Sequence, residues 1–205
     1  MGNTTVHTII EAGAWLRQGR LVIYPTETFY ALGCRADSSA ACAAVVRAKG
    51  RPQDKPLPVV VGDWDMVQEF FLLAGEAERL AQRFWPGALT LVLPLRRSFA
   101  PQVQNASGQV AVRMTSHPAA AALSREVGVP VVTTSANRSG EAAASRPEGL
   151  DRSLMGPEVV FLDVLPWPAG GLASTIVAFP QGRAEILREG AVPRQAVEAV
   201  LQSAW

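Results

Sequence analysis

Short apolar runs and stretches of helical periodicity alternate along this chain, and this alternation restricts its fold more than any other feature. Residues 8–18 carry apolar side chains at helical spacing, residues 21–24 form a short apolar run, and residues 40–48 are an alanine-rich helical stretch ending at Gly50. The same reasoning predicts helices at 63–73, 76–84, 118–127 and 193–201, and strands at 57–61, 89–93, 109–113, 129–134, 159–164, 174–179 and 184–187. An alternating order of this kind is typical of α/β proteins. We therefore predict a single domain over residues 1–205, with a twisted sheet of mixed parallel and antiparallel strands flanked by helices.

The bulk composition indicates a folded protein and gives little sign of a highly charged partner. Hydrophobic residues make up 48% and charged residues 18% of the 205 residues, which is ordinary for a globular protein. The net charge of +1 offers no overall attraction to nucleic acid, although a local basic patch is compatible with it. No apolar run approaches the ~20 residues that span a bilayer, and no secretory signal is visible. Cys34 and Cys42 are expected to be buried or half-buried thiols, and the protein to be cytoplasmic.

Two cations follow the end of the helix predicted at 40–48. Lys49 and Arg51 flank a glycine, a proline then forces the chain to continue extended, and Lys55 follows closely. Two residues apart on extended backbone, Lys49 and Arg51 can project to the same side, and we expect both to be exposed. The segment is either a solvated basic loop or a site for phosphate or carboxylate groups, for which Arg offers a planar fork and Lys a point charge.

A second polar segment follows the strand predicted at 129–134. Ser135 and Asn137 lie at its carboxyl end, where open α/β sheets place ligand-binding loops, although such a turn can also be purely structural. Ser135 lacks the G-x-S-x-G context of a nucleophile, and neither of the two histidines, His7 and His117, has a triad context. We therefore expect Ser135 and Asn137 to act through hydrogen bonds, and His117 to begin the helix that follows it.

Polar and cationic residues recur at other strand ends. Thr26, Glu27 and Thr28 follow the first predicted strand and form either a capped turn or part of a cleft wall. Arg113 and Arg188 each close a predicted strand. A single arginine of this kind is usually a surface cation, but repetition at several strand ends favours a shared site.

Several motifs of nucleotide and metal binding are missing from the sequence. There is no G-x-x-x-x-G-K-[ST], no G-x-G-x-x-G, no H-E-x-x-H and no clustered set of metal ligands. If phosphates bind, they do so through side-chain cations, with Mg²⁺ brought in by the nucleotide rather than held by the protein. Residues 138–147 are rich in small and polar side chains and are expected to form a loop or a lid.

These motifs together resemble the YrdC-like family, the threonylcarbamoyl-AMP synthases. The resemblance runs in family order from about residue 20 to residue 190, and it implies the short, single-domain form of the fold with a concave cleft. The matching segments are Pro25 to Gly33, Lys49 to Pro52, Lys55 to Leu57, Trp85 to Gly87, Leu89 to Leu91, Val110 to Arg113, Thr134 to Asn137, Ala173 to Ile176 and Ile186 to Arg188.

The resemblance implies a nucleotidyltransferase that uses L-threonine, bicarbonate or CO₂, and ATP with its Mg²⁺. The products are threonylcarbamoyl-adenylate and pyrophosphate, and partner proteins then transfer the threonylcarbamoyl group to position 37 of tRNA. Because several anionic groups share one site, such a reaction calls for Arg and Lys side chains rather than a protein nucleophile.

The resemblance also assigns roles to individual residues. Lys49 and Arg51 are implied to be catalytic by orienting the reacting anions. The residues implied to bind ATP are Arg51, Lys55, Gln109, Asn137, Ser145 and Arg188, and those implied to bind threonine are Thr26, Thr28, Arg113, Ser135 and Ser174. Val60 departs from the pattern, since some members carry a threonine-contacting histidine at this position.

Two alternatives of other kinds remain open at this point. The same fold can serve as a module that binds double-stranded RNA or tRNA through a basic surface, which the net charge of +1 weakly disfavours. The second alternative is a paralogue that uses the same pocket for a different carbamoyl substrate.

Overall fold

The computed structural model describes residues 4–52 and 54–203, and it confirms an α/β fold with mixed strand pairing. Its helices are α1 (Ile9–Arg17), α2 (Ser39–Lys49), α3 (Trp64–Phe70), α4 (Gly75–Phe84), α5 (Pro118–Val127) and α6 (Arg194–Gln202). Short 3-10 turns lie at Pro101–Val103, Pro147–Gly149, Arg152–Leu154 and Pro180–Gly182.

The strands form two hydrogen-bonded sheets, where the sequence predicted one. In spatial order, the first sheet contains β1 (Thr4–Val6), β9 (Val159–Leu162), β2 (Leu21–Pro25), β3 (Tyr30–Gly33) and β8 (Thr134–Ser135). The second contains β11 (Glu185–Arg188), β10 (Thr175–Ala178), β5 (Leu89–Pro94), β6 (Gln109–Met114), β4 (Val59–Val61) and β7 (Val131–Val132). Parallel and antiparallel pairs occur in both, for example β2 with β9 and β2 with β3 in the first sheet.

One continuous segment takes part in both sheets, and this explains why the single strand predicted at 129–134 is instead two short ones. β7 pairs with β4 in the second sheet, and two residues later β8 pairs with β3 in the first. Between them, the backbone N–H of Thr133 donates to the carbonyl of Pro58 at 2.8 Å. The crossing delivers Ser135 to the junction of the two sheets.

The helix ends follow from local chemistry. Thr8 and Glu11 form a reciprocal capping box at the start of α1. Gly50 ends α2 at φ 59°, a left-handed conformation that favours glycine. His117 begins α5, as expected, and its Nδ1 accepts from the N–H of Ala119 at 3.2 Å.

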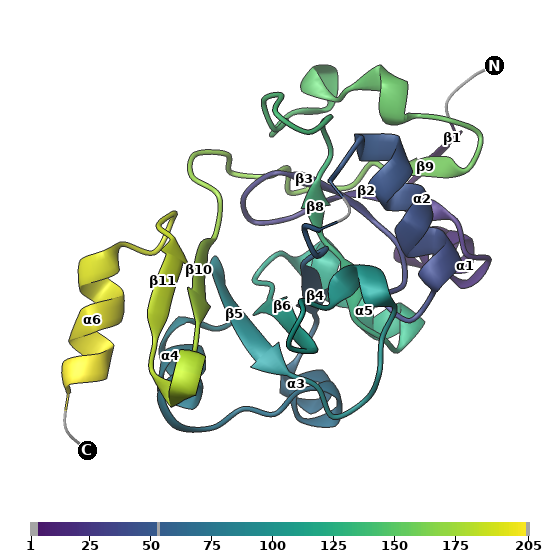
Figure 1. Ribbon diagram of the computed structural model, residues 1–205. Coiled ribbons are helices and arrows are strands. Elements are labelled where there is room, and N and C mark those ends of the chain that lie inside the picture. The colour runs from purple at the N-terminus through teal and green to yellow at the C-terminus, as the bar shows by residue number, and fades with distance from the viewer. Residues whose placement is uncertain (1–3, 53, 204–205) are drawn as a thin grey trace.

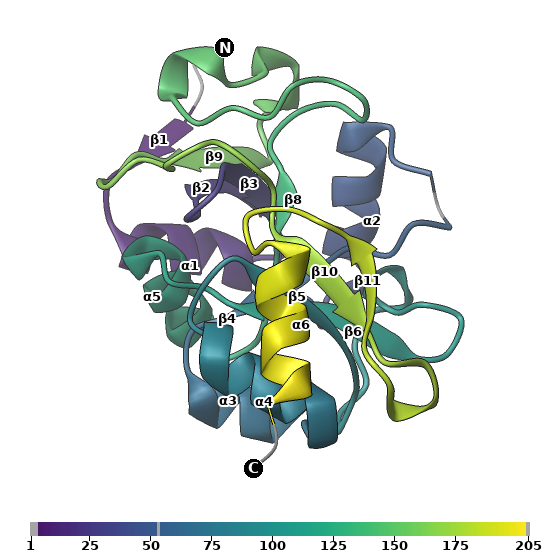
Figure 2. The same cartoon turned by 90° about the vertical axis from the view of Figure 1, so that its left-hand side faces the viewer.

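Helices cover both sheets and bury two clusters of hydrophobic side chains. α1 and α5 pack on each other and on the first sheet, whereas α4 packs on β5 and on α6, which lies beyond β11 at the edge far from α1 (Figures 1 and 2). The hydroxyl of the fully buried Tyr24 donates to the carbonyl of Val132 at 2.9 Å, joining the sheets from inside. No helix in this described part of the chain is long and apolar enough to cross a bilayer.

Cys34 and Cys42 are both buried free thiols, as expected. Their sulfur atoms lie 3.6 Å apart. The hydrogen bond between them and then burial raise the pKa of the Cys34 thiol well above its usual value, and both side chains belong to the buried core.

Candidate active site

A pocket lies where the two sheets meet, and most of the predicted site residues line it. Its cavity measures about 240 Å³, and its walls come from the β2–β3 turn of the first sheet and from β5, β6, β10 and β11 of the second. The predicted residues that line it are Thr26, Thr28, Arg51, Arg113, Ser135, Ser174 and Arg188. A larger groove of about 670 Å³ lies between α4 and α6, but it contains none of the predicted residues.

The pocket is cationic. The charged side chains among its described lining residues are those of Arg51, Arg113 and Arg188, and no carboxylate accompanies them. The other polar side chains of this described lining carry hydroxyls. Such a lining suits an anion with several phosphate or carboxylate groups.

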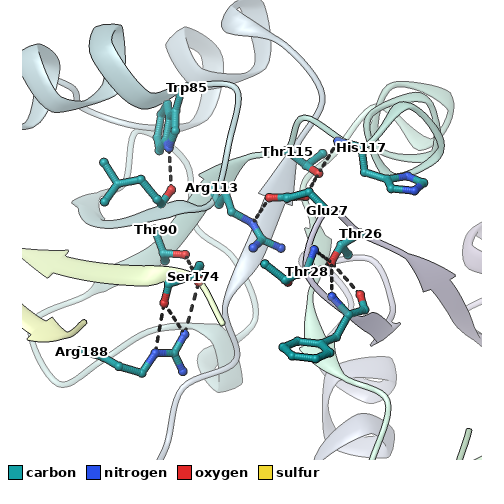
Figure 3. Close-up of polar contacts among 12 residues, drawn as sticks. Thr26, Glu27, Thr28, Trp85, Thr90, Arg113, Thr115, His117, Ser174 and Arg188 are labelled. Carbon is teal, nitrogen blue, oxygen red and sulfur yellow. Dashed lines mark hydrogen bonds and ion pairs between the residues drawn. The ribbon is translucent and has the colours of Figure 1, made fainter. Parts of the chain in front are cut away.

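Arg113 is held on one side by an ion pair. It stands on β6 with its side chain 5% exposed, and its Nε lies 3.1 Å from Oε1 of Glu27, although the N–H does not point along a hydrogen bond. Oε2 of Glu27 accepts from the hydroxyl of Thr115 at 2.5 Å. Figure 3 shows the outer end of the guanidinium turned away from Glu27 toward Thr28.

Arg188 is held by the backbone of a neighbouring strand. Its Nη2 donates to the carbonyl of Ser174 at 2.8 Å, and the Ser174 hydroxyl lies 2.9 Å from that of Thr90 (Figure 3). Gly190 permits this close packing, since a Cβ there would lie 2.0 Å from the carbonyl oxygen of Ala173. Burial, followed by the charge of Arg113, lowers the pKa of Arg188, but a guanidinium keeps its charge.

Thr26 and Thr28 form the turn between β2 and β3. The Thr26 hydroxyl donates to the carbonyl of Phe29 at 2.7 Å and lies 3.3 Å from the Thr28 hydroxyl. Both threonines are buried at the pocket wall. The sequence predicted this segment to be either a capped turn or part of a cleft wall. It is both, since the Thr26 side chain caps the turn and the turn lines the cavity.

Arg51 is half-buried beside the pocket and is fixed by its own loop. Its Nε donates to the carbonyl of Lys55 and its Nη2 to that of Pro56, each at 2.9 Å. Burial lowers the pKa of Arg51 without removing its charge. These bonds leave Nη1 without a protein partner among the hydrogen bonds of the described chain.

Lys49 is buried, and the expectation that it is exposed is wrong. It is 3% exposed, and its ammonium group donates to the carbonyls of Ser135 and Asn137 instead of lining the pocket. The reason lies in the helix: Ala41 and Val45 precede it at four-residue spacing on the buried face of α2. Lys49 therefore fastens the Ser-Ala-Asn segment to the end of α2.

Four other predicted residues lie outside the pocket lining. Asn137 is buried and its amide donates to the carbonyls of Arg138 and Glu141, so it shapes the following loop. Lys55 is exposed beside α2, Gln109 accepts from Asn105 at the start of β6, and Ser145 lies near Gly170.

Two hydroxyl residues of the site were not predicted. Thr90 lines the pocket from β5 and supports Ser174, and Thr115 supports Glu27. Thr90 could have been identified from its place between two leucines in a strand predicted to be buried. A buried hydroxyl needs a hydrogen-bond partner, which marks such a residue as part of a polar site.

The buried lysine predicts a pH dependence of stability. Burial, with the charge of Arg51 second, lowers the pKa of Lys49 to about 8, below the 10.5 of an ordinary lysine. Between these values the unfolded chain binds more protons than the folded one, so this group makes the free energy of unfolding rise with pH. We expect the free energy of unfolding of the wild type, relative to that of Lys49→Met, to increase from about pH 8 to pH 10. Urea titration at several pH values measures this difference. A difference that stays constant would contradict the buried, low-pKa ammonium, since every other ionisable residue is common to both proteins.

The described residues offer no set of side chains that could bind a metal ion without a substrate. No group of three or more His, Cys, Asp or Glu side chains among them is placed to hold a metal ion.

The sequence profile of the Sua5, YciO and YrdC proteins, described as telomere recombination, matches residues 14–190. The chain belongs to this Sua5/YciO/YrdC family. The resemblance seen in the sequence is thereby confirmed, and the motifs between residues 20 and 190 all fall within the matched range.

Relatives of this Sua5/YciO/YrdC chain carry enzyme names. A threonylcarbamoyl-AMP synthase of Bacillus subtilis is 38% identical over 196 residues, which cover 94% of this chain and 56% of that protein. A putative threonylcarbamoyl-AMP synthase of Mycobacterium leprae is 40% identical over 195 residues, covering 94% and 87%. The chain thus spans little more than half of the first relative and most of the second.

Solved structures share the same fold. Pyrococcus abyssi Sua5 in complex with L-threonine is 30% identical with a TM-score of 0.86, covering 98% of this chain and 61% of that one. Escherichia coli YciO, at 22% identity and a TM-score of 0.75, covers 89% of both chains and supports the fold alone.

Proposed function

We propose that this protein makes L-threonylcarbamoyl-adenylate from L-threonine, bicarbonate or CO₂, and ATP, with release of pyrophosphate. The observation that carries the proposal is the convergence of three guanidiniums and several hydroxyls, from both sheets, in one pocket of a Sua5/YciO/YrdC fold. Threonine is the ligand of the P. abyssi relative of the same fold. The pocket is, in this proposal, the inner part of the cleft implied by the sequence.

Two ligand regions follow from the positions of the arginines. Arg113, with Thr26, Thr28, Ser135 and Ser174 nearby, is assigned to threonine, whose carboxylate matches the outer fork of the guanidinium. Arg51 and Arg188 are assigned to the phosphates of ATP. Lys55, Gln109, Asn137 and Ser145 remain assigned to ATP beyond the pocket lining, and Mg²⁺ to the phosphates as part of the substrate.

The chemistry then needs no protein nucleophile. The deprotonated amine of threonine adds to the carbon of CO₂ and gives a carbamate, and the proton passes to solvent. A carbamate oxygen attacks the α-phosphorus of ATP, the bond from that phosphorus to the bridging oxygen breaks, and pyrophosphate leaves. The arginines hold the anions together and neutralise charge, while Lys49 acts indirectly by holding the Ser135 segment.

The product has a cytoplasmic use in this proposal. A partner transferase passes the threonylcarbamoyl group to position 37 of tRNA, so tRNA meets this protein indirectly. Direct binding of double-stranded RNA has no specific support in the pocket: of the cations in its described lining, Arg113 is buried and Arg51 is half-buried, which leaves Arg188 as the exposed one.

Omission of single substrates tests the proposed function. We expect pyrophosphate release only when L-threonine, bicarbonate and ATP are all present, measured by a coupled phosphate assay. Serine and valine serve as matched amino acids, each lacking one feature of threonine. Release that ignores threonine, or no release with any amino acid, would contradict the proposal.

A further inference from the structure

Glu27 lies between the two groups of residues assigned to threonine, the β2–β3 turn and Arg113. It lies in the β2–β3 turn, between Thr26 and Thr28, whereas Arg113 belongs to β6 of the other sheet. Its side chain is 14% exposed and is not part of the pocket lining. Any effect of Glu27 on a ligand therefore passes through another residue.

Both carboxylate oxygens of Glu27 are directed at groups of the second sheet. Oε1 lies 3.1 Å from Arg113 Nε, and Oε2 accepts from Thr115 Oγ1 at 2.5 Å (Figure 3). Thr115 is itself fixed, because its hydroxyl oxygen accepts from the N–H of His117 at the start of α5. The carboxylate thus joins the turn of the first sheet to β6 and to α5.

This arrangement determines which edge of Arg113 faces the pocket. The Nε edge is next to Glu27, so the terminal nitrogens are left for a ligand. The negative charge also offsets the repulsion between Arg113 and Arg188, which share the pocket before any anion enters.

We propose that Glu27 is the positioning residue of Arg113, aiming its guanidinium at the carboxylate of the amino-acid substrate and setting its distance from Thr26 and Thr28. This inference rests on the proposed function and adds to it. Glu27 takes no part in proton transfer or bond making; its contribution is the geometry and charge of one ligand group.

Glu27→Gln tests this role, because the amide keeps the size of the side chain and an acceptor for Thr115 but removes the charge. We expect the Kd of L-threonine, measured by calorimetry, and its KM to rise by about tenfold, while the KM of ATP changes less than twofold. Glu126→Gln is the matched control, since Glu126 pairs with Arg17 at 2.9 Å on α1 and α5, away from the pocket. This variant is expected to leave both KM values unchanged.

A second variant, with a smaller expected effect, tests the same role if Glu27→Gln does not fold. Thr115→Val removes the hydroxyl that steadies Glu27 and leaves both charges in place, so the same selective loss for threonine is expected at smaller size. Circular dichroism checks the fold of each variant.

The outcomes separate this inference from the proposed function. A wild-type protein that neither binds threonine nor releases pyrophosphate contradicts the proposed function itself. A wild-type protein that does both, with an unchanged threonine Kd in folded Glu27→Gln and Thr115→Val, overturns only the role of Glu27. Equal losses for threonine and ATP would also overturn it, because they indicate general damage to the pocket.

Discussion

Arg51→Ala is expected to reduce pyrophosphate release by about a hundredfold or more, because it removes a fixed positive charge from a pocket whose other described cations, Arg113 and Arg188, stand on strands of the second sheet. The loss should affect kcat as well as the KM of ATP, since charge on the phosphates grows as pyrophosphate leaves. Arg51→Lys should recover part of the rate, because it restores the charge but not the planar fork.

The control for this variant lies one helical turn away. Arg47 is an exposed cation in the last turn of α2, and Arg47→Ala should leave turnover unchanged. Unaltered turnover in folded Arg51→Ala would show that this arginine does not hold the reacting anions. The two variants change the net charge equally, so a difference between them is a matter of position.

Lys49→Met is expected to lower the free energy of unfolding by about 2 kcal/mol at neutral pH. The methionine fills the same space, but the carbonyl of Asn137 loses its lysine donor, and an unpaired buried carbonyl costs about 1–3 kcal/mol. The carbonyl of Ser135 also loses the ammonium but keeps the N–H of Asn137, which donates to it at 2.9 Å. Urea unfolding measures the loss, with Lys55→Met as the exposed-lysine control.

The same variant should be impaired in turnover, because the Ser135 segment is released from α2. An exposed Lys49, as expected from the sequence, would have given no such loss of stability; the burial of its side chain is what predicts it. Equal unfolding free energies for Lys49→Met and Lys55→Met would contradict the structural role of the buried ammonium.

Features governed by local chemistry could be predicted from the sequence. Gly50 marks the end of α2 and His117 the start of α5 because caps depend on a few adjacent residues. Most strands could be located by their apolar runs. The pocket arginines Arg113 and Arg188 could be identified because each follows such a run.

Features governed by packing between distant segments could not be predicted. β3 has the sequence Tyr-Ala-Leu-Gly, which favours a strand only weakly, and it is a strand because β2 and β8 pair with it on both sides. The division into two sheets depends on the crossing near Thr133, which no local pattern indicates. The burial of Lys49 was visible in the helical spacing of Ala41 and Val45, but the charge favoured the opposite interpretation.

The passage of residues 131–135 from one sheet to the other has a mechanical consequence. Val132 pairs with β4 of the second sheet and also bonds to Tyr24 of β2 and to Cys34 directly after β3, and Thr134 pairs with β3 two residues later. The two sheets are therefore tied to each other within three residues of Ser135. The chain has almost no slack there. Relative motion of the sheets is thus converted directly into displacement of a pocket side chain, and the spacing of the anion-holding groups is as stiff as the backbone that joins the sheets.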